Sequence, residues 1–171
     1  MYLISSDISH VHYDTLLNYV LENCDEFTVR IPKYTVDDCV ELSESIRNST
    51  KLMYDVYFDN ACNFADTLFG QHIISTRFSN EYCSSCYGDT QKIYRIRLNQ
   101  EVIEVLQTAE HLFGWKYPFL PEDPCFYVKG KCLIETISHE GFWRLFSEDK
   151  SARFFLRKIR AKFRMSSYDA Q

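Results

Sequence analysis

The sequence predicts an α+β fold, a single-domain sandwich in which a mostly antiparallel sheet packs against three to four helices. The chain has 171 residues, a length that suits one domain over residues 1–171. Helical and strand patterns follow the order helix, strand, helix, several strands, helix, two strands, helix, which indicates an α+β sandwich. Hydrophobic residues make up 46% of the chain and aromatic residues 16%, so a sizeable core can form.

The first third of the chain predicts two helices with a strand between them. Residues 13–24, YDTLLNYVLENC, place apolar side chains at helical spacing, with Asp14 as the N-cap candidate. Residues 27–32, FTVRIP, alternate and stop at a proline, which is typical of a short strand. Residues 35–49 return to helical spacing, and Thr35 can cap this second helix.

The middle of the chain favours strands. Residues 51–60, KLMYDVYFDN, are rich in β-forming side chains and alternate, which predicts a strand. Residues 63–69 fit either a helical turn or part of a meander. Residues 71–78 and 91–98 each predict a strand, the latter with one polar face, and residues 81–90 form the predicted loop between them.

Residues 99–115 give the clearest helix pattern. Asn99 can cap this helix, acidic residues follow in its first turn, and Gly114 suits the left-handed position after a helix. Residues 117–124, YPFLPEDP, contain three prolines and predict an extended connector. A hairpin follows the connector directly.

The two-residue turn Lys129-Gly130 sets the register of this hairpin. The pairs expected from it are Val128 with Lys131, Tyr127 with Cys132, Phe126 with Leu133, and Cys125 with Ile134. Cys125 and Cys132 then lie diagonally across the two strands, with about 7–8 Å between their backbones. Since a disulfide requires a Cα separation of about 5.5–6 Å, we expect no bond between them.

The last part of the chain, from Ser138, predicts helix with a break near Ser147 and a basic amphipathic helix over about residues 148–165. Seven basic residues and no acidic residue lie between positions 150 and 164, although the net charge of the chain is −5. Residues 1–149 carry 23 acidic against 12 basic residues. An acidic body therefore ends in a basic segment.

One side of this C-terminal helix is a candidate binding surface. The arginines spaced by four, three and four residues along one stripe are Arg153, Arg157, Arg160 and Arg164. They could contact an acidic protein, a phosphate backbone or an anionic membrane, or pair with carboxylates of the body. Because the acidic body repels polyanions, we expect a protein partner, rank nucleic acid below it, and expect no membrane contact.

Missing motifs exclude several chemistries. The sequence has no glycine-rich phosphate loop, no dinucleotide fingerprint and no G-x-S-x-G elbow, so we expect no cofactor. We find no signal-peptide pattern, and no apolar run approaches the roughly 20 residues of a membrane span. Seven cysteines, an odd number, then predict reduced thiols and a cytoplasmic location.

Metal-ligand patterns are incomplete, and the sequence predicts no metal. Cys83 and Cys86 have the spacing of a zinc knuckle, but no second C-x2-C pair accompanies them. The segment SHEGFW begins like the H-E-x-x-H of zinc proteases, yet Trp143 stands where the second histidine belongs.

The His-Glu pair of that segment supplies the catalytic candidates His139, Glu140 and Asp123. Histidine titrates near neutral pH, so His139 can serve as a general base that Asp123 or a nearby glutamate orients if the chain folds back. The alternative is structural: Ser138 caps a helix, and Glu140 favours its positive end.

The stretch that ends in this pair resembles a pattern in a family of small uncharacterised bacterial proteins. The matching positions are Trp115, Pro121, Glu122, Asp123, Phe126, Tyr127, Gly130, Ser138, His139 and Glu140. The resemblance covers roughly residues 112–142 and implies no particular activity, although partner-binding or immunity roles are suspected for such proteins. We count Trp115 and Glu122 among the binding candidates.

These observations give one leading hypothesis and two alternatives. We expect a non-catalytic, cytoplasmic protein-binding domain, similar to an immunity protein that inhibits its partner. The first alternative is a small hydrolase that uses His139 with a nearby carboxylate. The second is nucleic-acid contact through the basic C-terminal helix.

Overall fold

The computed structural model describes residues 1–34, 44–81, 87–116, 120–147 and 149–166. The elements follow in the order β1 (Tyr2–Ile4), α1 (Val11–Asn23), β2 (Glu26–Pro32), α2 (Glu44–Phe69), η2 (Gly70–His72), β3 (Ile73–Glu81), β4 (Tyr87–Arg97), α3 (Gln100–Leu106), η3 (Leu112–Gly114), β5 (Glu122–Val128), β6 (Lys131–Ile137), η4 (Ser138–Glu140), β7 (Phe142–Leu145), α4 (Lys150–Lys158) and β8 (Phe163–Met165), where η marks a short 3-10 turn. The predicted α+β fold is confirmed.

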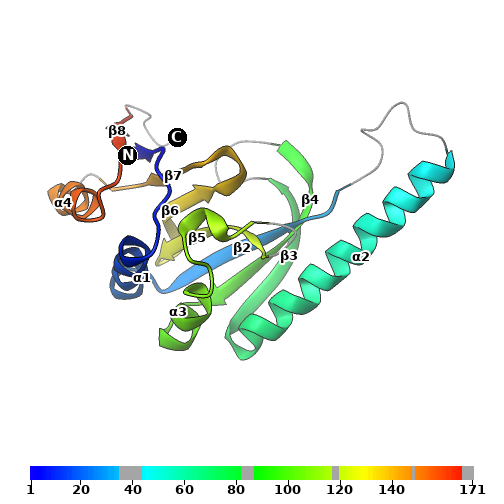
Figure 1. The fold of residues 1–171 in the computed structure, drawn as a ribbon. Coiled ribbons are helices and arrows are strands. Elements are labelled where there is room, and N and C mark those ends of the chain that lie inside the picture. The colour runs from blue at the N-terminus through cyan, green and yellow to red at the C-terminus, as the bar shows by residue number, and fades with distance from the viewer. Residues whose placement is uncertain (35–43, 82–86, 117–119, 148, 167–171) are drawn as a thin grey trace.

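The eight strands form one antiparallel sheet. Their order across the sheet is β3-β4-β2-β5-β6-β7-β1-β8, and every neighbouring pair is antiparallel. Three hairpins join strands that are neighbours in sequence, whereas β2 inserts between β4 and β5, and β1 inserts between β7 and β8. The first and last strands therefore lie side by side at one end of the sheet (Figure 1).

One face of the sheet is apolar and carries the helices. In β2, Phe27, Val29 and Ile31 are completely buried on this face, and Thr28 and Arg30 alternate onto the other. Side chains from all four described helices join the same core as these strand residues, and Figure 1 shows α1, α2 and α3 on the same side of the sheet. The opposite face carries most of the polar and charged strand residues, such as Arg95, Glu135 and Arg144, together with a few apolar ones.

A buried chain of hydrogen bonds joins α1 to α3 and to the segment after it. The Trp115 Nε1–H donates to the Tyr13 hydroxyl over 2.9 Å, and that hydroxyl donates to the Leu106 carbonyl over 3.0 Å. Burial raises the pKa of Tyr13 well above its usual range, so the hydroxyl keeps its proton. Trp115, a binding candidate from the sequence, is completely buried in the core, which removes it from the surface.

Residues 44–69 form one helix where the sequence predicted a strand over residues 51–60, so that prediction was wrong. No glycine or proline interrupts this stretch, and Phe58, Ala65 and Phe69 are among the residues that return toward the sheet at helical spacing. The buried stripe of residues 58–69 favours a helix, and the residues before it continue that helix despite the β-propensity of single tyrosines and valines. None of the described helices combines the length and the apolar character needed to cross a bilayer.

The region after β6 also differs from the predicted helix. Ser138–Glu140 make only a 3-10 turn, which Gly141 ends in the left-handed conformation with φ 69°. The strand β7 follows and pairs with β6 and β1. Trp143 and Leu145 lie two residues apart, and both side chains are in the core. This period of two is the period of a strand and not of a helix.

The basic helix α4 ends at Lys158, earlier than the predicted boundary near residue 165. Two backbone bonds close its end: the Ala161 N–H donates to the Leu156 carbonyl, and the Arg160 N–H donates to the Arg157 carbonyl. Arg160 takes the left-handed conformation, with φ 53°, that glycine usually supplies at this position. The sequence therefore contains no glycine that would mark the end of this helix.

Two other predicted boundaries are partly right. The Asn99 side chain accepts a 3.0 Å hydrogen bond from the Val102 N–H, which confirms the N-cap of α3. The helix ends at Leu106, however, and Gly114 belongs to a separate 3-10 turn. The first helix begins at Val11, so Asp14 lies inside its first turn and is not its cap.

The β5–β6 hairpin confirms the predicted turn and two of the four predicted pairs, Val128 with Lys131 and Tyr127 with Cys132. Further along, Phe126 pairs with Ile134 in place of Leu133. One extra residue in β6 produces this shift as a β-bulge. Cys125 and Cys132 are free thiols, as expected.

Three predictions fall on residues outside the described part of the chain. They concern the start of the helix predicted over residues 35–49, the Cys83–Cys86 spacing, and residues 117–119 of the connector predicted over residues 117–124, whose last three residues belong to strand β5 instead.

Replacing Tyr13 by phenylalanine tests the buried hydrogen-bond chain. The free energy of unfolding should fall by about 1–3 kcal/mol, because the Trp115 N–H and the Leu106 carbonyl lose their partner without access to water. Urea denaturation measures the change. Tyr57→Phe, at an exposed tyrosine, is the control, and in dilute solution it should stay within about 0.5 kcal/mol of the wild type. Equal losses in the two variants would contradict the proposed role of the bond.

Candidate functional site

Polar residues gather on the open face of the sheet where β2 meets β5. Arg30 of β2 pairs with Glu122 of β5, and Thr28 pairs with Cys125. One residue lies between the paired positions on β2 and two lie between them on β5. The strand β5 therefore carries a bulge at Asp123 and Pro124, and bulges of this kind redirect a side chain out of the regular alternation.

Asp123 occupies this bulge with φ 52°, a left-handed conformation that aspartate tolerates better than most residues. Its side chain is completely buried, and Oδ1 accepts a 2.6 Å hydrogen bond from the Ser138 N–H. This bond ties β5 to the turn η4. The other oxygen, Oδ2, has no hydrogen-bond partner within the described part of the chain.

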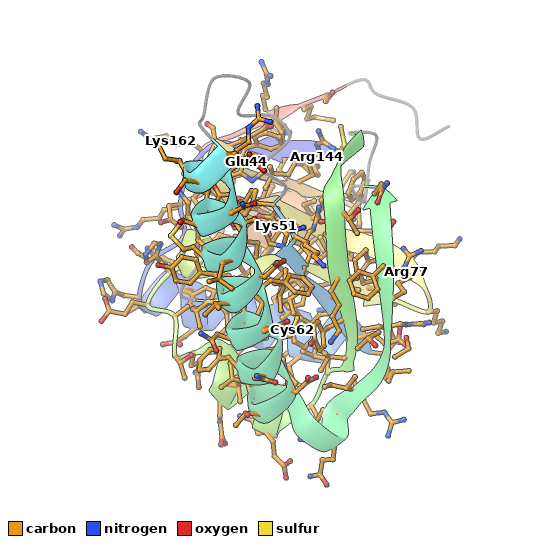
Figure 2. All side chains as sticks on the ribbon, turned by 90° about the vertical axis from the view of Figure 1, so that its right-hand side faces the viewer. Glu44, Lys51, Cys62, Arg77, Arg144 and Lys162 are labelled. Carbon is orange, nitrogen blue, oxygen red and sulfur yellow. The ribbon has the colours of Figure 1, made fainter. Side chains whose placement is uncertain are left out.

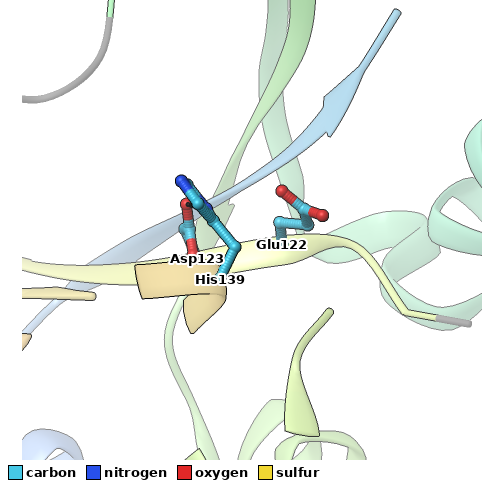
Figure 3. Close-up of side chains that lie close together, drawn as sticks. All are labelled: Glu122, Asp123 and His139. Carbon is cyan, nitrogen blue, oxygen red and sulfur yellow. Dashed lines mark ion pairs between the residues drawn. The ribbon is translucent and has the colours of Figure 1, made fainter. Parts of the chain in front are cut away.

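The turn η4 carries His139 to the same place. The imidazole Nδ1 lies 3.9 Å from Asp123 Oδ2, and Nε2 lies 3.8 Å from Glu140 Oε1. The imidazole is 40% exposed, whereas Asp123 and Glu122 are buried. Figure 3 shows Glu122, Asp123 and His139 projecting toward the same side of β5. We call these three residues the carboxylate–histidine cluster.

Arg30 supplies a buried positive charge beside the cluster. The residue is only 4% exposed, its Nε lies 4.0 Å from Asp123 Oδ2, and its Nη2 donates to Cys125 Sγ over 3.7 Å. A buried carboxylate requires such a neighbour, because an isolated charge in the interior is costly. The sequence analysis did not single out Arg30. The alternation of FTVRIP indicated that Arg30 lies on the polar face of its strand. Only the pairing of β2 with β5 brings Arg30 close to Asp123.

The cluster has the residue types of an acid–base site, but within the described part of the chain its two His139–carboxylate contacts are too long for one. Both distances from His139 to a carboxylate exceed the hydrogen-bonding range of about 2.7–3.2 Å. Ser138 and Cys125, which could offer a hydroxyl or a thiol, are buried and present no nucleophile to solvent. Two carboxylates and an imidazole are, however, ligands for a divalent metal ion, and their ligand atoms all lie within 4.8 Å of one another.

The sequence candidates separate into two regions. The structure brings the catalytic candidates His139, Glu140 and Asp123 together with Glu122. Two segments of the sequence resemblance, P-E-D and S-H-E, therefore meet in space, joined by the bond between Asp123 and Ser138.

The arginine candidates lie on the other region, formed by α4 and β8. Arg153 and Arg157 are on α4, Arg160 follows its end, and Arg164 is on β8. All four are exposed. They do not share one helical stripe as predicted, because the helix stops before Arg160.

A third surface, on α2, was missed by the sequence analysis because residues 51–60 were predicted as a strand. Residues 44–57 include no buried side chain, and the buried stripe begins at Phe58. In Figure 1 this first half of α2 extends away from the other helices. Glu44 and Lys51 mark it in Figure 2, and Cys62 marks the half that packs on the sheet.

Charge is distributed unevenly around α2. Successive residues of a helix are rotated by about 100° around its axis. On this basis, the six charged residues of α2 fall within about one third of the helix circumference, on the same side as the buried residues of its second half. Half of the circumference carries no charge, and we call it the outer face of α2. Its exposed large apolar residues, between 42 and 67% exposed, are Ile46, Leu52, Met53, Val56, Tyr57 and Phe64.

Comparison with protein-family models, with curated proteins and with solved structures finds no match to this chain. The likeness of residues 112–142 to small bacterial proteins therefore stays a prediction. Function has to be inferred from the residues and their arrangement.

Substitutions at Asp123 test how the cluster is held. Asp123→Val should lower the free energy of unfolding by about 3–5 kcal/mol, because it removes a counter-charge of buried Arg30 and places a β-branched residue at positive φ. Asp123→Asn should lose less, since its amide oxygen can still accept from the Ser138 N–H. Urea denaturation of both variants gives the order. A valine variant as stable as the asparagine variant would contradict this description.

Proposed function

We propose that the protein is a protein-binding domain and that the outer face of α2 is its contact surface. The observation that carries the proposal is the absence of charge from the exposed half of this helix. A surface helix of a monomeric domain usually presents charged residues to solvent. The core of a protein–protein interface is instead depleted of charge and enriched in methionine, tyrosine and phenylalanine, as the outer face of α2 is.

The outer face contains a regular stripe. Six positions follow one another at alternating spacings of four and three, which is the spacing of a coiled-coil seam. The α2 stripe consists of Ile46, Thr50, Met53, Tyr57, Asn60 and Phe64. It extends over about 27 Å at 1.5 Å per residue. A second helix laid along α2 would contact these side chains.

The polarity of the α2 stripe is the same from either end. Its positions run apolar, polar, apolar, apolar, polar, apolar. If a second copy of α2 lies antiparallel on the first, Ile46 faces Phe64 and Met53 faces Tyr57. Thr50 then faces Asn60, and the two polar side chains can hydrogen-bond to each other. This self-complementarity supports a second copy of the chain as the partner.

The antiparallel arrangement also supplies contacts for the unpacked first half of α2. Residues 44–57 of one copy would lie along the outer face of residues 53–66 of the other. The net charge of −5 does not oppose this contact directly, because the charged residues of α2 lie on the opposite side of the helix. The proposed contact consists of a single helix pair, so we expect association that depends on concentration.

Met53→Glu tests the surface. Sedimentation of the wild-type chain should show a monomer–dimer equilibrium, and Met53→Glu should be monomeric because two carboxylates would be buried opposite Tyr57. Asn48→Glu is the control: it adds the same residue to an exposed position of α2 on the charged side, and dimerisation should persist. Circular dichroism checks that both variants fold. A wild-type chain that stays monomeric at millimolar concentration would rule out the second copy.

Paired cysteines test the direction of the two helices. A mixture of a Thr50→Cys chain and an Asn60→Cys chain should form a mixed disulfide on mild oxidation, because these positions face each other only in the antiparallel arrangement. Thr50→Cys alone should form none between its two introduced thiols. Mass spectrometry of the linked peptides separates these products from those of native cysteines. A Thr50→Cys homodimer would indicate parallel helices.

A second candidate function, contact with a polyanion, is favoured by the basic region of α4 and β8. All seven basic residues between positions 150 and 164 are exposed. Within the described residues, no ion pair involves Arg153, Arg157, Arg160 or Arg164. These side chains are thus available to anionic groups.

The salt dependence of binding tests this second function. Affinity for a short oligonucleotide duplex should fall steeply with salt concentration, since each phosphate contact releases a counterion. The double variant Arg157→Ala, Arg160→Ala should flatten that slope. Fluorescence anisotropy measures both. An unchanged slope in the double variant would exclude this surface as the contact.

A further inference from the structure

We infer that the carboxylate–histidine cluster binds one divalent ion of the first transition series, such as Mn²⁺ or Zn²⁺. Its ligands would be a carboxylate oxygen of Glu122, Oδ2 of Asp123 and Nδ1 of His139. These side chains come from β5 and from η4, and they project to the same side of β5 (Figure 3). The inference is independent of the outer face of α2.

Asp123 provides the observation that points to a ligand. Its side chain is completely buried, and Oδ1 is engaged by the Ser138 N–H. Oδ2 has no hydrogen-bond partner within the described residues, and it faces His139 Nδ1 at 3.9 Å and Arg30 Nε at 4.0 Å. A buried carboxylate oxygen without a hydrogen bond is costly. A cation coordinated by Oδ2 would remove that cost.

The distances fit a metal ion after a small adjustment. Ligand atoms about 2.0–2.2 Å from a metal lie at most about 4.4 Å apart. Oδ2 and Nδ1 already meet this limit at 3.9 Å, and the widest separation in the cluster, up to 4.8 Å, exceeds it slightly. Because His139 is 40% exposed while Glu122 and Asp123 are buried, its ring has more room than theirs to move by the few tenths of an ångström required.

The ligand types decide which ion fits. Calcium and magnesium prefer sites made only of oxygen ligands, whereas an imidazole beside carboxylates suits zinc, manganese or iron. Two carboxylates carry two negative charges, and the neighbouring Arg30 guanidinium balances one of them. A divalent ion is therefore attracted, although Arg30 limits its affinity. The exposed side of His139 leaves room for water in the remaining coordination positions.

Glu140 completes the arrangement from outside. Its Oε1 lies 3.8 Å from His139 Nε2, the ring nitrogen that would not touch the metal. A histidine that binds a metal usually donates its other N–H to a carboxylate, which fixes the orientation of the ring. We assign Glu140 this positioning role. Removal of such a partner typically weakens metal affinity by about 10- to 100-fold.

Mn²⁺ is the probe of choice, because cysteine thiolates bind Zn²⁺ strongly and the chain has seven cysteines. The full chain is freed of metal with a chelator and titrated with MnCl₂, and the electron paramagnetic resonance signal of free Mn²⁺ measures binding. We expect one saturable site per chain. Glu140→Gln should weaken binding by about tenfold, and His139→Gln should weaken it more.

The controls separate ligand loss from loss of fold. His139 is partly exposed, so His139→Gln should unfold at nearly the wild-type temperature, whereas Asp123 variants are destabilised by their burial. His111→Gln removes another histidine that lies beside a carboxylate, Asp7, and should leave Mn²⁺ binding unchanged. No saturable binding by the wild type up to millimolar Mn²⁺, or equal affinities for the wild type and His139→Gln, would overturn the inference.

Discussion

The strict alternation of side chains across one antiparallel sheet is the constraint on which the rest of the structure depends. It sends Phe27, Val29 and Ile31 to the face that the helices cover, and it forces Thr28 and Arg30 onto the other. The polar face collects residues that a core would exclude. Bulges interrupt the alternation locally, and at the bulge in β5 the Asp123 carboxylate meets Arg30 and, with the help of η4, His139.

Burial also sets α2 apart from the other helices. Its second half contributes to the core through Phe58, Ala65 and Phe69, but its first half contributes nothing. Exposed apolar side chains without neighbouring charges are unfavourable in water. A partner that covers them removes their surface from water, so the same side chains then make a favourable contribution to the free energy of association. The helix is thus long because two kinds of contact act along it: the sheet at one end and, as proposed, a second chain along its outer face.

Local patterns predicted the fold class, the β5–β6 turn and the N-cap at Asn99, because each depends on residues close together in sequence. Propensity failed for residues 51–60: the buried stripe of residues 58–69 favours a helix, and no glycine or proline ends that helix before residue 51. The sequence also indicated His139 and Asp123 as candidates. It could not indicate Arg30, because its approach to Asp123 depends on a strand pairing between residues far apart in the chain.

Amide hydrogen exchange of α2 at several protein concentrations tests the central claim most directly. Residues 46–57 pack on no core of their own chain, so their protection in the monomer should be low. Exchange in this segment should slow as concentration rises and dimers form, while amides in β2 and β4 stay unchanged. Exchange of residues 46–57 that is independent of concentration over the whole accessible range would contradict the assignment of α2 as an interface between copies.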